Sequence, residues 1–209
     1  MLLSSLFCAV LFGVSVATRS NFSEESIHNV DIVKFWNTSE LIWTTYTTVL
    51  TRRVCKVDIK KNISQTNINF TRSYLRKTRS SSEWTTREYN GLFYNFSSGN
   101  ESQMPFDSVY ITSRQKYDDA TEVLYYQSQD NMCAVFSVLT IRGPILKPSY
   151  DIRMKNSSVH KIPAAKSECW PKFLEVSEGR QKRRLYDPRC QKALHDKFPN
   201  PLHDSWHSK

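Results

Sequence analysis

An arginine set among aromatic residues is the first feature of this sequence that could bind a ligand. Residues 67–74 read Asn-Ile-Asn-Phe-Thr-Arg-Ser-Tyr, and Asn69 begins an Asn-x-Thr glycosylation sequon. Because side chains alternate along a strand, a glycan on Asn69 would turn the alternate residues inward. These are Ile68, Phe70, Arg72 and Tyr74. A guanidinium pairs with a carboxylate through two hydrogen bonds, so this face predicts a site for an acidic lipid, unless Arg72 lies at the mouth of the fold or pairs with an acid of the chain itself.

A second group of residues suits a ligand of the opposite charge. Trp84 and Glu88 lie four positions apart, on one side of a strand, and Asp151 follows Tyr150. A carboxylate held against aromatic faces attracts a cationic amine through ion pairing and cation–π contacts. The alternative is that Glu88 is an exposed strand residue and Trp84 belongs to the core. The full set of predicted ligand-binding residues is Tyr46, Phe70, Arg72, Tyr74, Trp84, Glu88, Phe136 and Asp151.

The sequence lacks the signatures of catalysis. It has no nucleophile elbow, no His-Glu-x-x-His motif and only five glycines, none of them in a phosphate-binding loop. His203 and His207 have helical metal spacing, but they lie in a proline-bounded tail without a third ligand. We therefore expect no enzyme activity, no metal site and no cofactor.

The N-terminus predicts export from the cell. Residues 1–17 are apolar or small, carry no charged side chain and end in Ser-Val-Ala, as in a cleaved signal peptide. We expect one domain at residues 18–197 and a disordered tail at residues 198–209. The number of glycosylation sequons also supports a secreted, extracellular protein. These sequons are Asn21, Asn37, Asn62, Asn69, Asn95, Asn100 and Asn156.

Four cysteines remain after removal of the signal peptide. In an exported chain they predict two disulfides, for which three pairings are possible. No two of them are close enough in sequence to suggest a zinc site. They are Cys55, Cys133, Cys169 and Cys190.

The chain is basic, with a formal net charge of +9. Such a charge indicates acidic partners such as glycosaminoglycan, nucleic acid or an anionic membrane, or only a solubilising surface. Secretion argues against nucleic acid, and we expect a monomer with neither a nucleic-acid nor a membrane partner. The run Arg180-Gln-Lys-Arg183 fits a dibasic processing sequence, a glycosaminoglycan-binding surface centred on residues 180–184, or the exposed basic face of a helix.

The elements that must position these residues are mainly strands. A short amphipathic helix is predicted at residues 29–37, behind the possible caps Asn29 and Asp31. Eight runs rich in β-branched and aromatic residues follow, with no helices between them, which predicts an antiparallel barrel or sandwich. The runs are 41–50, 53–60, 67–76, 82–89, 107–113, 121–128, 132–141 and 149–155.

The segment after Cys169 has a different pattern. Apolar residues there sit among charged ones, which predicts a late helix packed on the sheet. The apolar residues concerned are Phe173, Leu174, Val176, Leu185 and Tyr186.

The chain resembles the tick salivary lipocalins, the histamine-binding family, over nearly all of its mature length. The matching pieces are residues 31–40 leading into Ile42-Trp43, Met132-Cys133 on a strand, Cys169-x-x-x-Phe173 and Tyr186-x-x-x-Cys190. The resemblance implies a mainly β fold, namely an eight-stranded antiparallel lipocalin barrel with a short N-terminal helix and a C-terminal helix tied on by disulfides. It also implies the pairings Cys55–Cys190 and Cys133–Cys169.

The resemblance further implies that the protein sequesters a small host mediator and so suppresses host inflammation or haemostasis. The mediator would be a lipid of the leukotriene or fatty-acid type, or a biogenic amine such as histamine or serotonin. The family's amine binders resemble one another in an acidic residue directly after the strand cysteine and a Glu-Leu-Trp/Tyr pattern before the next cysteine. This chain has Ala134 and then Asp151-Ile152-Arg153 at those places, which favours the lipid. The alternatives are a module that binds a host protein, such as a complement or clotting factor, through the barrel exterior, and a glycosaminoglycan-binding surface protein.

Overall fold

Eight antiparallel strands close into a barrel in the computed structural model, which describes residues 30–96, 104–113, 119–140 and 148–199. Each strand from β2 to β8 pairs with the next along the chain, and β1 pairs with both β8 and β2 to close the ring. The eight predicted strands and the lipocalin barrel are confirmed. Their bounds are β1 Ile42–Thr47, β2 Arg53–Ile63, β3 Asn67–Lys77, β4 Ser82–Tyr94, β5 Ser108–Ser113, β6 Ala120–Gln127, β7 Cys133–Thr140 and β8 Ser149–Lys155.

The C-terminal part of the chain completes the closure of the barrel between β1 and β2. Only Ile42 and Trp43 of β1 pair directly with β2. Towards the other end of β1, the two-residue strand β9 (Arg183–Arg184) pairs with Tyr46 and Thr47 instead. The next residue, Leu185, donates from its amide to the Thr45 carbonyl at 2.8 Å and accepts from the Cys55 amide at 2.8 Å. This segment therefore fills the gap where β1 and β2 separate.

The late helix predicted after Cys169 is confirmed for Phe173, Leu174 and Val176, but its extension to Leu185 and Tyr186 is wrong. Two helices form instead, α3 (Cys169–Val176) and α4 (Arg189–Lys197). Leu185 and Tyr186 lie between them in extended backbone, because the open edges of β1 and β2 offer them hydrogen bonds that a helix would forgo.

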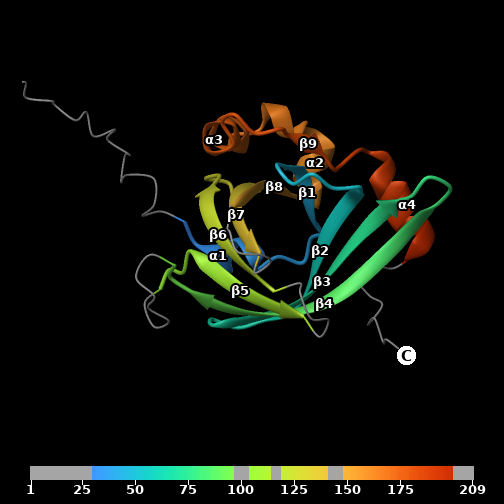
Figure 1. Cartoon of the computed structure of the whole chain (residues 1–209). Coiled ribbons are helices and arrows are strands. Elements are labelled where there is room, and N and C mark those ends of the chain that lie inside the picture. The colour runs from blue at the N-terminus through green and yellow to red at the C-terminus, as the bar shows by residue number, and fades with distance from the viewer. Residues whose placement is uncertain (1–29, 97–103, 114–118, 141–147, 200–209) are drawn as a thin grey trace, which may run out of the picture.

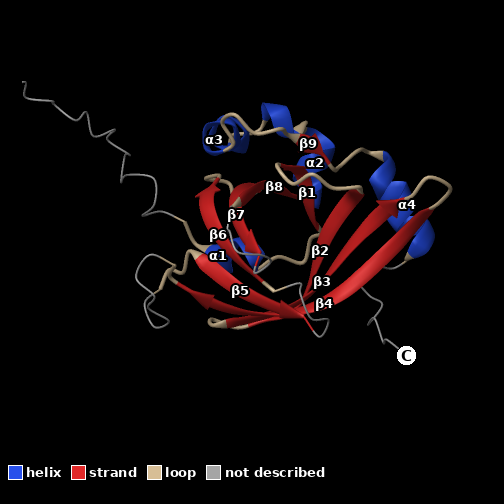
Figure 2. Ribbon diagram, viewed as in Figure 1, coloured by secondary structure: helices blue, strands red, loops and turns tan. Residues whose placement is uncertain are grey.

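One helix lies at one end of the ring, and the helices that follow β8 lie on its outside (Figures 1 and 2). Helix α1 (Ile32–Trp36) starts at Asp31, whose carboxylate accepts from the Lys34 amide at 2.9 Å, as its predicted capping role requires. It packs its buried Phe35 and Trp36 into the core of the barrel. Helix α2 (Asn156–Lys161), the short η2 turn (Ala164–Lys166), α3 and α4 follow β8 and lie outside the strands.

The outer helices cover two apolar faces of the barrel, and each face carries a disulfide. Cys55–Cys190 joins β2 to α4, and Cys133–Cys169 joins β7 to α3, which is the pairing implied by the family resemblance. Apolar side chains of β1 and β2 pack under α4, and those of β7 and β8 pack under α3. The apolar side of β2 and β8 therefore faces outward, whereas β7 has apolar residues on both sides.

The end of the barrel interior next to α1, called its lower end, is filled by a core of aromatic and aliphatic side chains. Phe136 meets Phe35 edge to face at 5.5 Å, and Phe70 lies 4.8 Å from Trp36 and stacks on Tyr89 at 5.3 Å. This core and α1 close one end of the barrel.

Gly91 on β4 is needed for this packing, and its replacement by alanine should destabilise the protein. A Cβ at this position would lie 2.7 Å from Cγ2 of Ile68 and 2.7 Å from Cγ2 of Val109. We expect Gly91→Ala to lower the free energy of unfolding by about 1–3 kcal/mol in urea titrations, because the neighbours must shift. The exposed neighbour Asn90 provides the control: Asn90→Ala should change the value by less than about 0.5 kcal/mol. Equal losses in both variants would contradict the packing argument.

Several expectations fall on residues outside the described ranges. They are the signal peptide at residues 1–17, the sequons Asn21 and Asn100, and His203 and His207. Of the tail predicted from residue 198, the described part includes Phe198, whose ring lies 6.1 Å from that of Trp84. Among the residues that the structure describes, no helix is long and apolar enough to cross a membrane.

Candidate ligand-binding site

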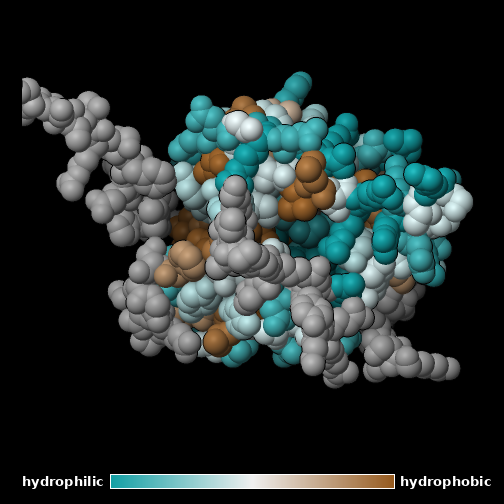
Figure 3. Space-filling view, viewed as in Figure 1, coloured by the Kyte–Doolittle hydropathy of each residue, from teal (hydrophilic) through white to brown (hydrophobic). Residues whose placement is uncertain are grey.

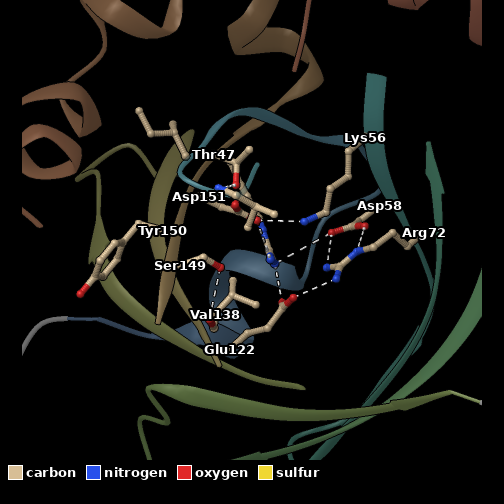
Figure 4. A network of polar contacts seen from close by, with 12 residues as sticks. Thr47, Lys56, Asp58, Arg72, Glu122, Val138, Ser149, Tyr150 and Asp151 are labelled. Carbon is tan, nitrogen blue, oxygen red and sulfur yellow. Dashed lines mark hydrogen bonds and ion pairs between the residues drawn. The ribbon is translucent and has the colours of Figure 1, made fainter. Parts of the chain in front are cut away.

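Six charged side chains meet inside the barrel above the aromatic core, and five of them are labelled in Figure 4. They comprise three cations and three carboxylates, so the cluster is neutral when all six are ionised. All six extend inward: β2 and β8 pack their apolar residues on the outer helices, whereas β3 and β6 add apolar residues to the core on the same inner side. The six are Lys56 and Asp58 of β2, Arg72 of β3, Glu122 of β6, and Asp151 and Arg153 of β8.

Arg72 is held by two carboxylates of the chain. Its Nε and Nη2 donate to the two oxygens of Asp58 at 2.6 and 2.8 Å, and its Nη1 donates to Glu122 at 2.9 Å. Burial lowers the pKa of Arg72, but the two carboxylates outweigh burial and raise it well above its ordinary value. Its guanidinium carbon also lies 5.3 Å from the Phe70 ring centre and 5.4 Å from that of Tyr89. Arg72 is therefore a fixed cation whose pairing positions are largely taken.

Arg153 has no exposed surface, like Asp58 and Glu122. Its Nη1 donates to Glu122 at 2.5 Å, while Asp151 and Asp58 lie at 3.6 and 3.9 Å. Its guanidinium carbon lies 4.3 Å from the centre of the Phe136 ring. Burial raises the pKa of Glu122, but Arg153 and Arg72 outweigh burial and hold this pKa far below its ordinary value. Glu122 is thus the anion that both arginines depend on.

Lys56 and Asp151 form the part of the cluster nearest the open end of the barrel. The Lys56 ammonium donates to Asp151 at 2.9 Å, which is its one carboxylate partner within the described part of the chain. Burial lowers the pKa of Lys56, although Asp151 acts in the opposite direction. For Asp151, burial raises the pKa, but Lys56 and Arg153 outweigh burial and lower it. An ammonium group has three donors, so Lys56 can bond a further acceptor.

A bulge in β2 accompanies the placement of Lys56. The pairing register with β3 shifts between Val54 and Val57, and Cys55 has a positive φ of 51°. Such a conformation is uncommon for a residue other than glycine, and here it coincides with the disulfide to Cys190. The flanking residues then alternate, with Val57 packed under α4 and Lys56 and Asp58 turned inward.

A cavity of about 340 Å³ lies above the charged cluster at the open end of the barrel. Lys56, Arg72 and Asp151 reach it from below, and Arg53 stands at its side with its guanidinium carbon 4.3 Å from the Tyr74 ring centre. Figure 3 views this end, where hydrophilic surface lines the visible recess and hydrophobic side chains stand beside it. The apolar lining residues are Val49, Leu50, Tyr74, Tyr89, Ile111, Ala120, Val138 and Leu185.

Several residues predicted to bind a ligand lie in or under this cavity. The structure buries all four inward candidates of β3, with Ile68 and Phe70 in the core and Arg72 and Tyr74 in the cavity wall. Asp151 also lines the cavity, and Phe136 lies in the core below it. Arg72 pairs with acids of the chain itself, as the alternative given from the sequence had it, and the role of these residues in ligand binding stays a prediction.

Three other predicted ligand-binding residues lie outside the barrel and do not line its cavity, which for Trp84 and Glu88 agrees with the alternative that the sequence also allowed. Trp84 packs near α4 against Phe198, and Glu88 on the same side of β4 is exposed. Tyr46 meets Trp170 of α3 edge to face at 5.0 Å. The physical reason is that the outer helices cover this side of β1 and β4, so that Tyr46 is partly buried by packing on α3 and Trp84 by packing near α4.

Four members of the site were missed in the sequence, namely Lys56, Asp58, Glu122 and Arg153. On each strand a polar residue alternates with apolar ones, a pattern that ordinarily marks the polar side as solvent-facing. The signal that could have found the carboxylates is the balance of charge, because Arg72, which the sequon at Asn69 placed inward, requires an inward carboxylate.

The sequons within the described ranges differ in exposure. Asn37, Asn62 and Asn69 are exposed, whereas Asn95 and Asn156 are half-buried. The side-chain amide oxygen of Asn156, Oδ1, accepts from Trp43 at 2.9 Å and from Gln191 at 2.7 Å. Glycosylation of these residues stays a prediction.

The barrel, the helix across one end and the disulfide-linked C-terminal helix define the chain as a lipocalin. Its sequence matches the model of the family described as tick histamine binding protein over residues 21–192, and the chain belongs to this family. No curated protein sequence matches it significantly.

Two solved structures resemble the fold. One is the serotonin complex of AM182, with 18% identity, a TM-score of 0.48, and coverage of 72% of this chain and 84% of that chain. The other is japanin from Rhipicephalus appendiculatus bound to cholesterol, with 8% identity, a TM-score of 0.48, and coverage of 73% of this chain and 96% of that chain.

Proposed function

We propose that this protein is a secreted lipocalin that sequesters a small host mediator in the cavity at the mouth of its barrel. The mediator is an amphipathic molecule with a carboxylate, of the leukotriene or fatty-acid type. Binding is non-covalent and removes the mediator from its receptors, which would suppress host inflammation or haemostasis. Family membership supports binding of a small ligand, and the charge of the cavity supports an anionic one.

The observation that carries the proposal is the set of cations around the cavity. Arg53, Lys56 and Arg72 line it, against the single carboxylate of Asp151. Arg72 is already paired with Asp58 and Glu122, so Lys56 and Arg53 are the cations left to a ligand. That carboxylate already accepts from Lys56 and lies 3.6 Å from Arg153. The apolar remainder of the wall suits a hydrocarbon body. A ligand carboxylate can bond the free donors of Lys56 without breaking the buried network.

A cationic amine such as histamine or serotonin fits this arrangement less well. It would need a carboxylate, but Asp58, Glu122 and Asp151 are each paired with a cation of the chain. Ala134, which takes the place of an acidic residue in the family's amine binders, is fully buried in the apolar core. Binding an amine would therefore require displacement of Lys56 or an arginine, at the cost of leaving that cation unpaired.

The cavity also bears on the alternative of a protein-binding module. That function predicts a barrel plugged by its own side chains. Here the core and charged cluster fill the lower interior, but about 340 Å³ remains open, at the small end of the range for ligand pockets. Such a volume suits a compact ligand, or the head group and adjoining chain of a longer one.

Lys56→Met should reveal the anchor for the carboxylate. We expect leukotriene affinity to fall by at least about tenfold, since one charge-assisted hydrogen bond contributes about 1.5–3 kcal/mol. Calorimetric titration of the secreted, glycosylated protein against a leukotriene and histamine side by side measures this. Lys34→Gln, on α1 at the closed end, is the control of equal charge loss and should bind like wild type.

Two results would contradict the proposal. One is saturable heat with histamine and none with the leukotriene. The other is absence of binding by both, which would favour a different ligand or a host protein.

A further inference from the structure

A groove on the outside of the barrel is lined mainly by cations. It lies where the turn before β2, the turn between β3 and β4, and β9 come together, and its volume is about 370 Å³. Arg52, Lys77, Arg79 and Arg183 make up four of the seven residues around it, and no acidic residue is among them. The other three are Thr51, Val54 and Thr78.

The fold holds these three segments against one another. The Lys77 amide donates to the Arg52 carbonyl at 3.3 Å, and the Arg183 guanidinium donates to the Thr51 carbonyl. The turn that carries Arg79 is closed by the Thr78 amide, which donates to the Ser81 carbonyl at 2.8 Å. The cations are therefore presented from ordered backbone.

A second groove continues the positive surface. It shares Lys77 with the first and adds Arg184, while its one acid, Asp187, accepts from Arg189 at 2.8 Å. We call Arg52, Lys77, Arg79, Arg183 and Arg184 the basic band. All five are exposed, and no ion pair joins any of them to a carboxylate of the described residues. The five positive charges of the basic band amount to more than half of the chain's formal net charge of +9.

We propose that the basic band binds a sulfated polysaccharide. Five unpaired cations on adjoining grooves repel one another and concentrate polyanions. Four of the five are arginines, whose planar guanidinium matches two oxygens of a sulfate or carboxylate. The proposal is independent of the barrel ligand, because none of the five lines the barrel cavity.

The same surface suits other polyanions less well. Single-stranded nucleic acid binds where bases stack on aromatic side chains, and the first groove has none. Stable binding to an anionic membrane takes an apolar side chain that inserts into the bilayer beside the basic patch. The exposed apolar residue Leu50 does not serve this purpose, because it belongs to the wall of the barrel cavity.

The basic band differs from the run at residues 180–184 that the sequence suggested. Arg180 donates to the Pro148 carbonyl and lies over the Tyr150 ring, and Lys182 bonds the Ser177 carbonyl at 3.4 Å. Only the last two members of the run join the basic band, and Arg52, Lys77 and Arg79 come from distant parts of the chain.

The test is binding of heparin to the full secreted protein in a series of salt concentrations. We expect the triple variant Arg52→Gln/Lys77→Gln/Arg79→Gln to bind at least about tenfold more weakly at physiological salt, with a shallower dependence of affinity on salt. The control triple variant Lys34→Gln/Lys161→Gln/Lys166→Gln removes three exposed cations elsewhere and should bind within about twofold of wild type. Circular dichroism checks that both variants fold.

Three results would overturn the proposal. Equal losses in the two triple variants would mean a non-specific effect of net charge. Equal binding of desulfated heparin would exclude recognition of sulfate. Tighter binding to vesicles of anionic phospholipid or to single-stranded DNA than to heparin would assign the surface to another partner.

Discussion

Replacing Glu122 by glutamine is expected to lower the free energy of unfolding by about 3–5 kcal/mol, the cost of leaving a buried cation without its partner. Glu122 has no exposed surface and accepts from Arg72 at 2.9 Å and from Arg153 at 2.5 Å. Glutamine keeps the shape but turns an NH₂ donor towards one of the two guanidinium groups. Arg153 would be left with carboxylates at 3.6 and 3.9 Å.

A double variant separates the loss of a partner from the loss of packing. Glu122→Leu/Arg153→Met removes one anion and one cation, and it leaves Arg72 with Asp58 and Lys56 with Asp151. Because the remaining cluster is neutral, this variant should be less destabilised than Glu122→Gln in urea titrations. Glu88→Gln, at an exposed carboxylate on β4, should change stability by less than about 0.5 kcal/mol. A double variant less stable than the single one would contradict the electrostatic explanation.

The same residue makes stability depend on pH in acid. The pKa of Glu122 in the folded protein lies below its ordinary value of 4.5 because Arg153 and Arg72 outweigh burial. A lowered pKa contributes stability that is fully present above the unfolded value and is lost as the pH falls towards the folded one. Wild type should therefore lose stability progressively below about pH 4.5, and Glu122→Gln should lose less over that range.

The fold was predictable from the sequence because each strand is marked by a local pattern of residue types. Runs of β-branched and aromatic residues separated by polar turns place all eight strands within a few residues of their observed bounds, apart from the longer C-terminal end of β4. The extended segment at Leu185 was not predictable. Its conformation depends on hydrogen bonds to Thr45 and Cys55, which are more than a hundred residues away in the sequence.

The candidate site was harder to predict because two of its strands, β2 and β8, invert the usual pattern of burial. In β2 the apolar Val57 and Ile59 face outward under α4, and Asp58 faces inward. In β8 the apolar Ile152 and Met154 likewise face α3, so that Asp151 and Arg153 turn inward. Arg72 was assigned correctly to the inner face because the sequon at Asn69 marks the opposite side of β3. On strands without such a sequon, nothing in the sequence indicated which side chains face the barrel interior.

The C-terminal segment that covers β1 and β2 depends on one covalent link. Cys55–Cys190 closes a loop of 135 residues, whereas Cys133–Cys169 closes one of 36. In the chain-entropy model, stabilisation grows with the logarithm of loop length and amounts to about 5 kcal/mol for the first bond and about 4 kcal/mol for the second. The first bond also holds Leu185, which is part of the wall of the barrel cavity.

Cys55→Ser/Cys190→Ser should therefore lose about 5 kcal/mol of unfolding free energy and also bind the barrel ligand more weakly than wild type. Urea titrations measure the first effect, and calorimetric titration with a leukotriene below the unfolding transition measures the second. Cys133→Ser/Cys169→Ser is the matched control, because α3 packs on the outer face of β7 and β8 and contributes no residue to the cavity lining. It should lose slightly less stability and keep its ligand affinity. Equal loss of affinity in the two disulfide variants would mean that the cavity depends on global stability, and not on the segment that Cys190 ties across β1 and β2.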